Sequence, residues 1–422
     1  MQRQSARRQL RTNGPKGRPT RSRKSTKLPN DSTAARGMKT VGLCMIVKNE
    51  SQVILRCLRN VRPLIDYALI VDTGSTDGTQ EIVKEYLSGT GLPGAVIEEP
   101  WCDFAHNRSF ALAKLRERAD IDYALVTDAD DLLVFADDFD ASTFKAALDK
   151  DVYNVEIRLG PTRLWRPQIL SNRLEFSYKG VVQEFLVAPR TVSAAGVAPG
   201  VYIEAGTDGV RSGNPDKYRD DAMTLEKALE KETDENIRAR YTFYLAANWM
   251  CVGEKEKALQ AFLQRAERGP PGQEVAISLY HAAQLKEALG YHDTDIIGTF
   301  LKAYEVDPRR AESLHGAMRY CRLTNKPHQG FLIGKHAIDI AKPIGDLAFA
   351  SWIYDYGVLE EFAAAAYSSG HYQYCVRSVE KILADRKIPE SERPRLRENA
   401  RIAAEKLAGS APKPKKAPGM AL

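Results

Sequence analysis

The chain has 422 residues, of which 43% are hydrophobic and 27% are charged, a balance typical of a globular protein with about two domains. No apolar run approaches the roughly 20 residues that cross a bilayer, and the N-terminus lacks the apolar segment of a secretory signal. We therefore expect neither a transmembrane segment nor a secreted protein. The six cysteines are scattered without a Cys-x-x-Cys pair, which argues against a zinc site or a disulfide framework. This usage favours a reducing, cytoplasmic compartment.

The net charge of +6 is concentrated at the N-terminus. Residues 1–37 contain eleven Lys and Arg against the single acidic residue Asp31, and they have almost no large apolar side chains. Such a segment buries too little apolar surface to fold, so we expect a disordered arm. It is either a solubilising segment or an arm that contacts a polyanion or a targeting receptor. The rest of the chain is net acidic, so its composition predicts no nucleic-acid footprint.

Short apolar strands alternate with helical segments from Val41 onward. The sequence predicts strands at 41–47, 67–71, 95–98 and 123–127, with helices at 52–61, 80–87 and 107–118 between them. This order is typical of an α/β domain with a mostly parallel sheet and helices on both faces. Shorter strands are expected further on, at 153–159, 163–166, 180–187 and 201–204.

The strand pattern ends near residue 215, and a helical repeat replaces it. Four stretches of similar length each predict a helix–turn–helix pair: 238–269, 273–308, 309–343 and 347–388. Gly253 and Gly290 would end the first helix of successive units. A period near 34 residues with small residues at helix crossings is typical of an all-α tetratricopeptide-like solenoid. We expect a disordered arm at 1–37, an α/β domain at 38–212, a helical domain at 213–408 and a disordered basic tail at 409–422.

Acidic residues follow two of the predicted strands, in Asp72-Thr-Gly-Ser-Thr-Asp-Gly-Thr79 and in Asp128-Ala-Asp130. Because the carboxyl ends of parallel strands meet at one edge of a sheet, both clusters should lie where α/β proteins bind ligands. Lys48-Asn49-Glu50 ends the first strand at the same edge. Carboxylates without a basic partner are costly there unless they meet a metal or a hydrogen-bonding ligand. A nucleotide with a metal-bound diphosphate supplies both, whereas a plain turn and an acidic surface loop are the alternatives.

Together these motifs resemble the family 2 glycosyltransferases of the GT-A fold, in the branch with a tetratricopeptide-like C-terminal region. The resemblance is carried by four segments of the α/β part, Leu43-Cys-Met-Ile-Val-Lys-Asn-Glu50, Val71–Thr79, Trp101-Cys-Asp-Phe-Ala-His-Asn-Arg108 and Val126-Thr-Asp-Ala-Asp130. Tyr178-Lys-Gly-Val-Val-Gln-Glu-Phe-Leu186 and Phe243-Tyr-Leu-Ala246 follow. Each motif is weak by itself, but the set in this order is specific.

The resemblance implies roles for individual residues around a nucleotide-sugar donor, with UDP as the expected nucleotide. Asp72 would contact the base, and Asp128 would reach the ribose. Asp130 would ligate Mn²⁺ or Mg²⁺ on the diphosphate, with Asp128 as the second acidic residue at the metal. The remaining donor-site residues would be Asn49 and Glu50 beside the nucleoside, and Asn107 and Arg108 lining the pocket.

The resemblance departs from the family pattern at Gln183, where the family usually has His before Glu. The metal would then be held by fewer protein ligands, or by another group such as Glu204. Glu184 is the candidate general base of an inverting transfer, with Asp130 as the second catalytic residue. A salt bridge from Glu184 to Lys179 or Arg190 is the structural alternative.

The resemblance implies a metal-dependent, inverting glycosyltransferase. A polypeptide held by the helical domain is the favoured acceptor, and glycan, lipid-linked or nucleic-acid acceptors remain open. The first alternative is a nucleotidyltransferase, which would need a Gly-rich phosphate loop that Leu43–Glu50 lacks. The second is a tetratricopeptide scaffold with a degenerate enzyme domain, which the intact Asp128/Asp130 pair disfavours.

Overall fold

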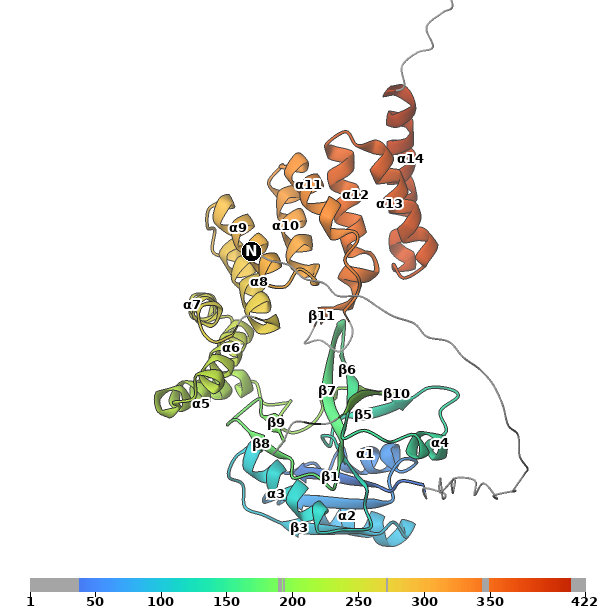
Figure 1. Cartoon of the computed structure of the whole chain (residues 1–422), viewed down its shortest axis with the longest axis vertical. Helices are drawn as coiled ribbons and strands as arrows, with labels where there is room; N and C mark the ends of the chain where they lie inside the picture. The colour runs from blue at the N-terminus through green and yellow to red at the C-terminus, as the bar shows by residue number, and fades with distance from the viewer. Residues whose placement is uncertain (1–37, 189–191, 193, 271, 344–348, 411–422) are drawn as a thin grey trace, which may run out of the picture. The chain divides into compact units, whose positions relative to one another are not determined.

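The computed structural model describes residues 38–188, 192, 194–270, 272–343 and 349–410. The predicted arm at 1–37 lies outside these residues, as does the predicted tail from residue 411 onward. Figure 1 shows strands and helices mixed in the blue-to-green part of the chain, and helices α5 to α14 following in chain order. No helix among the described residues is long and apolar enough to cross a membrane.

One sheet with the strand order β3-β2-β1-β4-β7-β6-β10-β5 organises the first part of the chain. Its first four strands pair in parallel and coincide with the predicted strands to within a residue or two. They are β1 (Val41–Val47), β2 (Tyr67–Asp72), β3 (Gly94–Glu98) and β4 (Tyr123–Val126). The parallel strands therefore end at one edge, as the acidic motifs require.

The second half of the sheet is mixed. Strand β7 pairs antiparallel with both β4 and β6, β10 is parallel to β6, and β5 is antiparallel to β10. These strands are β5 (Leu132–Phe135), β6 (Val152–Leu159), β7 (Thr162–Ser171) and β10 (Ala195–Glu204). The α/β class is confirmed, while β5 and the short helix α4 (Ala141–Ala146) were not predicted.

Three helices cover the parallel strands, on two faces. Because successive side chains of a strand point to opposite faces, β1 contributes to two cores. Leu43 and Met45 pack with helices α1 (Ile54–Val61) and α2 (Thr79–Thr90). Cys44 packs instead with helix α3 (Phe104–Arg116) on the other face. Apolar residues at consecutive positions thus become buried on both sides, as expected for a covered parallel sheet.

The prediction of a single strand at 180–187 is wrong. The structure has a separate hairpin of β8 (Ser177–Lys179) and β9 (Phe185–Val187), with a turn at 180–184 between them. Gly180 has a φ of 112° and Gln183 a φ of 54°, both in the left-handed region that a strand does not use. Glu184 is therefore presented from the end of a turn.

Ten helices occupy the described residues from Lys217 to Ser410. The predicted first unit is α6 (Glu235–Val252) with α7 (Lys255–Glu267), and the second is α8 (Gln273–Ala288) with α9 (Asp293–Val306). The third is α10 (Glu312–Leu323) with α11 (Pro327–Ala337), and the fourth is α12 (Val358–Ser368) with α13 (Tyr372–Asp385). Two further helices flank them, α5 (Lys217–Lys231) and α14 (Arg393–Ser410). Each helix packs on the next, so the tetratricopeptide-like region is confirmed.

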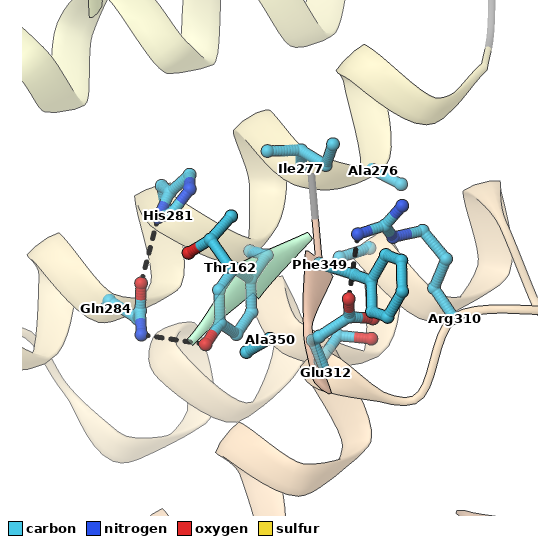
Figure 2. Close-up of a pocket in the computed structure, with 12 residues that line it drawn as sticks. Thr162, Ala276, Ile277, His281, Gln284, Arg310, Glu312, Phe349 and Ala350 are labelled. Atoms are coloured by element: carbon cyan, nitrogen blue, oxygen red, sulfur yellow. Dashed lines mark hydrogen bonds and ion pairs between the residues drawn. The ribbon is translucent and has the colours of Figure 1, made fainter. Parts of the chain in front are cut away.

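The fourth unit begins differently from the helix expected at residue 347. Strand β11 (Phe349–Ala350) pairs with Thr162 and Arg163 of β7, and a π-helical turn (Ile353–Gly357) precedes α12. A small cavity of about 230 Å³ lies at this junction, lined by residues of β7, β11, α8 and α10. Figure 2 shows its lining side chains, with Phe349 and Ala350 of β11 among them. Among its polar side chains, Arg310 and Glu312 form an ion pair at 2.7 Å, and Gln284 forms hydrogen bonds with His281 and Tyr280. The helical region is thus tied to the sheet through a strand.

Candidate functional site

A cavity of about 550 Å³ lies at the carboxyl ends of β1 and β4, which is the size range of small-molecule sites. The sequence-predicted residues that line it are Asn49, Glu50, Arg108, Asp128, Asp130 and Glu184. The structure therefore gathers most of the predicted site, from segments up to 135 positions apart in the chain, at the edge that the strand pattern indicated.

The segment after β1 is joined to the turn after β2 by hydrogen bonds. The backbone N–H of Asn49 donates to Ser75 Oγ at 2.8 Å, and the N–H of Thr76 donates to Asn49 Oδ1 at 2.8 Å. Asn49 has a φ of 58°, a conformation that Asn tolerates better than most residues. The N–H of Glu50 donates to Thr79 Oγ1 at 2.9 Å. The small polar residues of the Asp72–Thr79 motif thus hold Asn49 and Glu50 in place at the cavity.

Asp72 has a structural role in this turn. Its Oδ1 accepts hydrogen bonds from the N–H groups of Gly74 and Ser75 and from Gln80 Nε2, at 2.9 to 3.0 Å. The side chain is only 1% exposed and does not line the cavity. Its Oδ2 is buried and has no hydrogen-bond partner within the described part of the chain. The base contact of Asp72 stays a prediction, and it would require that this oxygen become accessible.

The prediction that Asn107 lines the donor pocket is wrong. The side chain is fully buried, and both ends of its amide are used inside the protein. Its Oδ1 accepts from the N–H of Cys102 at 3.0 Å, and its Nδ2 donates to the carbonyl of Pro100 at 3.1 Å. Asn107 therefore fixes the segment that carries Trp101 into the cavity wall.

Arg108 joins the two halves of the site. Its Nε donates to Glu184 Oε1 and its guanidinium NH2 to Asp128 Oδ1, both at 2.6 Å. The Arg108 side chain is 11% exposed and that of Glu184 15% exposed, so water screens this pair weakly. Burial raises the pKa of Asp128, but the Arg108 charge overrides burial and lowers it below its usual range. Neither Lys179 nor the undescribed Arg190 is needed to explain the position of Glu184.

Two acidic side chains, Glu50 in the cavity wall and Asp131 next to the cavity residue Asp130, lack sufficient positive charge around them. Burial raises the pKa of Glu50 to about 7, and the charges of Asp130 and Asp128 add to that rise. Burial and Asp128 likewise raise the pKa of Asp131 to about 7. Glu50 Oε2 and Asp131 Oδ2 are buried without hydrogen-bond partners among the described residues. A group that brings positive charge or hydrogen-bond donors would stabilise this arrangement.

A divalent cation fits this arrangement with few protein ligands. In the described ranges, no three His, Cys, Asp or Glu side chains are grouped to hold a metal. Asp130 is the suitable ligand, because its Oδ2 makes only a long bond of 3.3 Å with Ser212 Oγ. Asp128 is already paired with Arg108, and Glu204 is exposed and does not line the cavity. Diphosphate oxygens and water would have to complete the coordination shell.

A segment between β10 and α5, residues 205–216, packs over Asp130. Arg56 Nη1 and Nη2 bind Asp208 at 2.6 and 2.8 Å, and Nη2 also donates to the Asp130 carbonyl at 3.2 Å. Gly209 allows close approach, since a Cβ there would lie 2.8 Å from Asp130 Oδ2. Arg211 pairs with Asp221 of α5 at 2.5 Å. These contacts could not be predicted from local sequence patterns, because they join segments up to 152 positions apart.

Two basic residues of the cavity were also missed. Arg166 comes from the antiparallel strand β7 and Lys217 from the first turn of α5. The charges of both lower the pKa of Asp128, after the larger effects of burial and Arg108. Unlike Arg108, neither forms a salt bridge with any residue that the structure describes. No motif marks them, because each belongs to an element whose position depends on the tertiary fold.

Comparison with known proteins agrees with this geometry. Residues 43–184 match the model of glycosyl transferase family 2. A stretch of 96 residues is 34% identical to an uncharacterized glycosyltransferase of Rickettsia prowazekii, covering 23% of this chain and 30% of that protein. Another of 89 residues is 33% identical to a lipopolysaccharide core biosynthesis glycosyltransferase of Rhizobium meliloti, covering 21% and 31%. Residues 43–184, within the α/β part of this chain, thus match a family 2 glycosyltransferase domain.

Other similarities concern tetratricopeptide proteins. A stretch of 98 residues is 38% identical to a TPR repeat-containing protein of Synechococcus elongatus, covering 23% of this chain and 22% of that protein. A solved tetratricopeptide repeat protein from Parabacteroides merdae aligns over 46% of this chain and 68% of its own, with 14% identity and a TM-score of 0.33. The chain spans between about a fifth and a third of the length of the curated relatives that it matches.

Proposed function

We propose that the protein transfers a sugar from a nucleotide-diphosphate sugar to an acceptor, with inversion at the anomeric carbon. The proposal rests on one observation above all. Carboxylates that lack sufficient positive charge and unpaired basic side chains face the same 550 Å³ cavity at the strand ends of a glycosyltransferase domain. A nucleotide diphosphate with a divalent cation carries charges of both signs and complements such a site.

The residues of the cavity can divide the work of a single displacement. The acceptor oxygen or nitrogen attacks the anomeric carbon, and the bond from that carbon to the diphosphate oxygen breaks. The electron pair of the broken bond stays on the diphosphate, and the acceptor proton passes to a carboxylate. Mn²⁺ or Mg²⁺, when bound by Asp130, would supply positive charge to the leaving diphosphate. Glu184 lines the cavity and is the proposed base, with its orientation set by Arg108.

The helical region supports the candidate base directly. Tyr241 of α6 accepts a hydrogen bond at its hydroxyl from the N–H of Val181 at 3.2 Å, and Arg240 donates to the carbonyl of Gln183 at 3.1 Å. These contacts hold the turn that ends at Glu184. Because α6 contacts this turn, a polypeptide bound along the helical region would lie near the transfer site. We therefore propose a polypeptide as the acceptor.

A donor panel tests the proposal. The protein is incubated with UDP-, GDP- and CMP-linked sugars and Mn²⁺, and release of free nucleotide is measured with and without EDTA. We expect one donor class to release its nucleoside diphosphate, and Asp130→Asn to remove nearly all of that release. Asp138→Asn, an exposed aspartate in the segment after β5, is the matched control and should match the parent protein.

Each outcome of the panel bears on a separate part of the proposal. In a parallel incubation with nucleoside triphosphates and a sugar 1-phosphate, release of pyrophosphate would favour the nucleotidyltransferase instead. Undiminished activity in EDTA would remove the metal from the proposal but leave the transfer. If no donor were turned over or bound, the results would favour the tetratricopeptide scaffold with a degenerate enzyme domain.

A further inference from the structure

Two basic side chains of the cavity suggest how the donor is held. Arg166 and Lys217 both line the cavity, on elements outside the family's acidic motifs. The other two arginines of the wall are already neutralised, since Arg108 binds Asp128 and Glu184 and Arg211 binds Asp221. The Lys217 ammonium lies 5.5 Å from the ring centroid of Tyr218 and forms no salt bridge within the described part of the chain, so its charge is available to a ligand. Two free positive charges thus face a cavity whose floor is acidic.

The charge balance of the proposed ligand requires such groups. The diphosphate of a nucleotide sugar enters beside Glu50, Asp128 and Asp130, and on leaving as a nucleoside diphosphate it carries more negative charge than one divalent cation neutralises. Repulsion from these carboxylates would oppose binding unless further cations face the phosphates. A third unpaired cation, Lys48, is exposed and directly precedes Asn49, on the side assigned to the nucleoside.

We propose that Arg166 and Lys217 bind the diphosphate of the donor and stabilise it as the leaving group. The assignment rests on the proposed function, because it requires a nucleotide-diphosphate donor. It also gives the helical region a direct part in the donor site, since Lys217 is the first residue of α5. In the same helix, Asp221 holds Arg211, whose guanidinium carbon lies 4.6 Å from the ring centroid of Phe104 in the cavity wall. Helix α5 therefore belongs to the enzyme's binding site as well as to the solenoid.

Binding measurements with and without the phosphates test this role. The parent protein is titrated calorimetrically with UDP, GDP, CDP and ADP in Mg²⁺, and the tightest ligand is then compared with its nucleoside. We expect Lys217→Gln and Arg166→Gln each to lower the affinity for the nucleoside diphosphate by about 10- to 100-fold, as for the loss of a charge-assisted hydrogen bond. Affinity for the nucleoside should change by less than about twofold. Lys217→Arg should restore most of the affinity, because it keeps the charge.

The control lies in the same helical turn. Arg219 is exposed and does not line the cavity, so Arg219→Gln removes an equal charge and should leave the affinity unchanged. If the parent protein binds no nucleoside diphosphate, the proposed function fails. If it binds one and the two variants bind it as tightly as Arg219→Gln does, the role of Arg166 and Lys217 is refuted. Equal loss for the diphosphate and the nucleoside would also refute it. Circular dichroism checks folding, and the two variants lie in different elements, so misfolding of one leaves the other as the test.

Discussion

Replacing Arg108 by Met should destabilise the α/β domain more than the same replacement of an exposed arginine in the same helix. Arg108 makes two bonds of 2.6 Å to carboxylates, and the shielded partner is Glu184, 15% exposed. Removing one member of a buried ion pair costs about 3–5 kcal/mol, because the other charge stays buried without a partner. Asp128, 39% exposed, adds less because water screens it. We therefore expect Arg108→Met to lower the free energy of unfolding by about 3–5 kcal/mol.

A double-mutant cycle isolates the contribution of the Arg108–Glu184 pair. Arg108→Met, Glu184→Gln and the double variant are unfolded in urea and followed by the fluorescence of Trp101 and Trp165, both in the α/β part. The coupling energy should be about 1.5–3 kcal/mol, as for a hydrogen bond to a charged group. The control is Arg116→Met, also in α3, whose 3.4 Å contact is with Glu175, a side chain 73% exposed. That variant should cost less than about 1 kcal/mol.

The same variants also test the catalytic assignment of Glu184. If Glu184 is the base, Glu184→Gln should lower the turnover number by about 10²–10⁴-fold while nucleotide-sugar affinity is kept. A coupling energy near zero, or an Arg108→Met variant as stable as Arg116→Met, would refute the structural reasoning. Parental turnover by Glu184→Gln would move the base elsewhere, with Asp131, a buried carboxylate next to Asp130, the next residue to test.

Two further predictions concern the helical region. Gly334→Ala should destabilise it by about 1–3 kcal/mol in urea unfolding, since the new Cβ would lie 2.4 Å from Phe362 Cδ2. Gly298 has open space around it, so Gly298→Ala should stabilise the region by up to about 1 kcal/mol. Equal effects of the two substitutions would contradict this packing. Burial lowers the pKa of His315 from 6.5 to about 4, so the folded state excludes a proton that the unfolded state binds, and stability should fall as the pH drops from about 6.5 toward 4. The loss of stability is about 3 kcal/mol when complete, and it should disappear in His315→Gln. It should persist in His328→Gln, which replaces an exposed histidine as a control. An unchanged pH profile in His315→Gln would overturn this prediction.

The parallel half of the sheet and the place of the acidic motifs could be predicted from local patterns of residues. Strand β1 at Val41–Val47 was predicted residue for residue, because an uninterrupted apolar run bounded by polar residues reflects burial on both faces. The turn at Asp72–Thr79 followed from small polar residues that bond to their own backbone, which is local chemistry. The helical repeats were predictable for a related reason, since each unit buries the same face against the next.

The contacts that complete the site depend on how distant segments pack together. Arg108 and Glu184 lie 76 positions apart, and no local pattern distinguishes their pairing from one with Lys179. The burial of Asn107, the exposure of Glu204 and the left-handed turn at Gln183 likewise depend on neighbours that are distant in sequence. Arg166 and Lys217 reach the cavity because an antiparallel strand and the first helix of the solenoid pack beside it. The hydrophobic periodicity of the sequence indicates which side chains are buried. The partners of charged side chains depend instead on how whole helices and strands pack together.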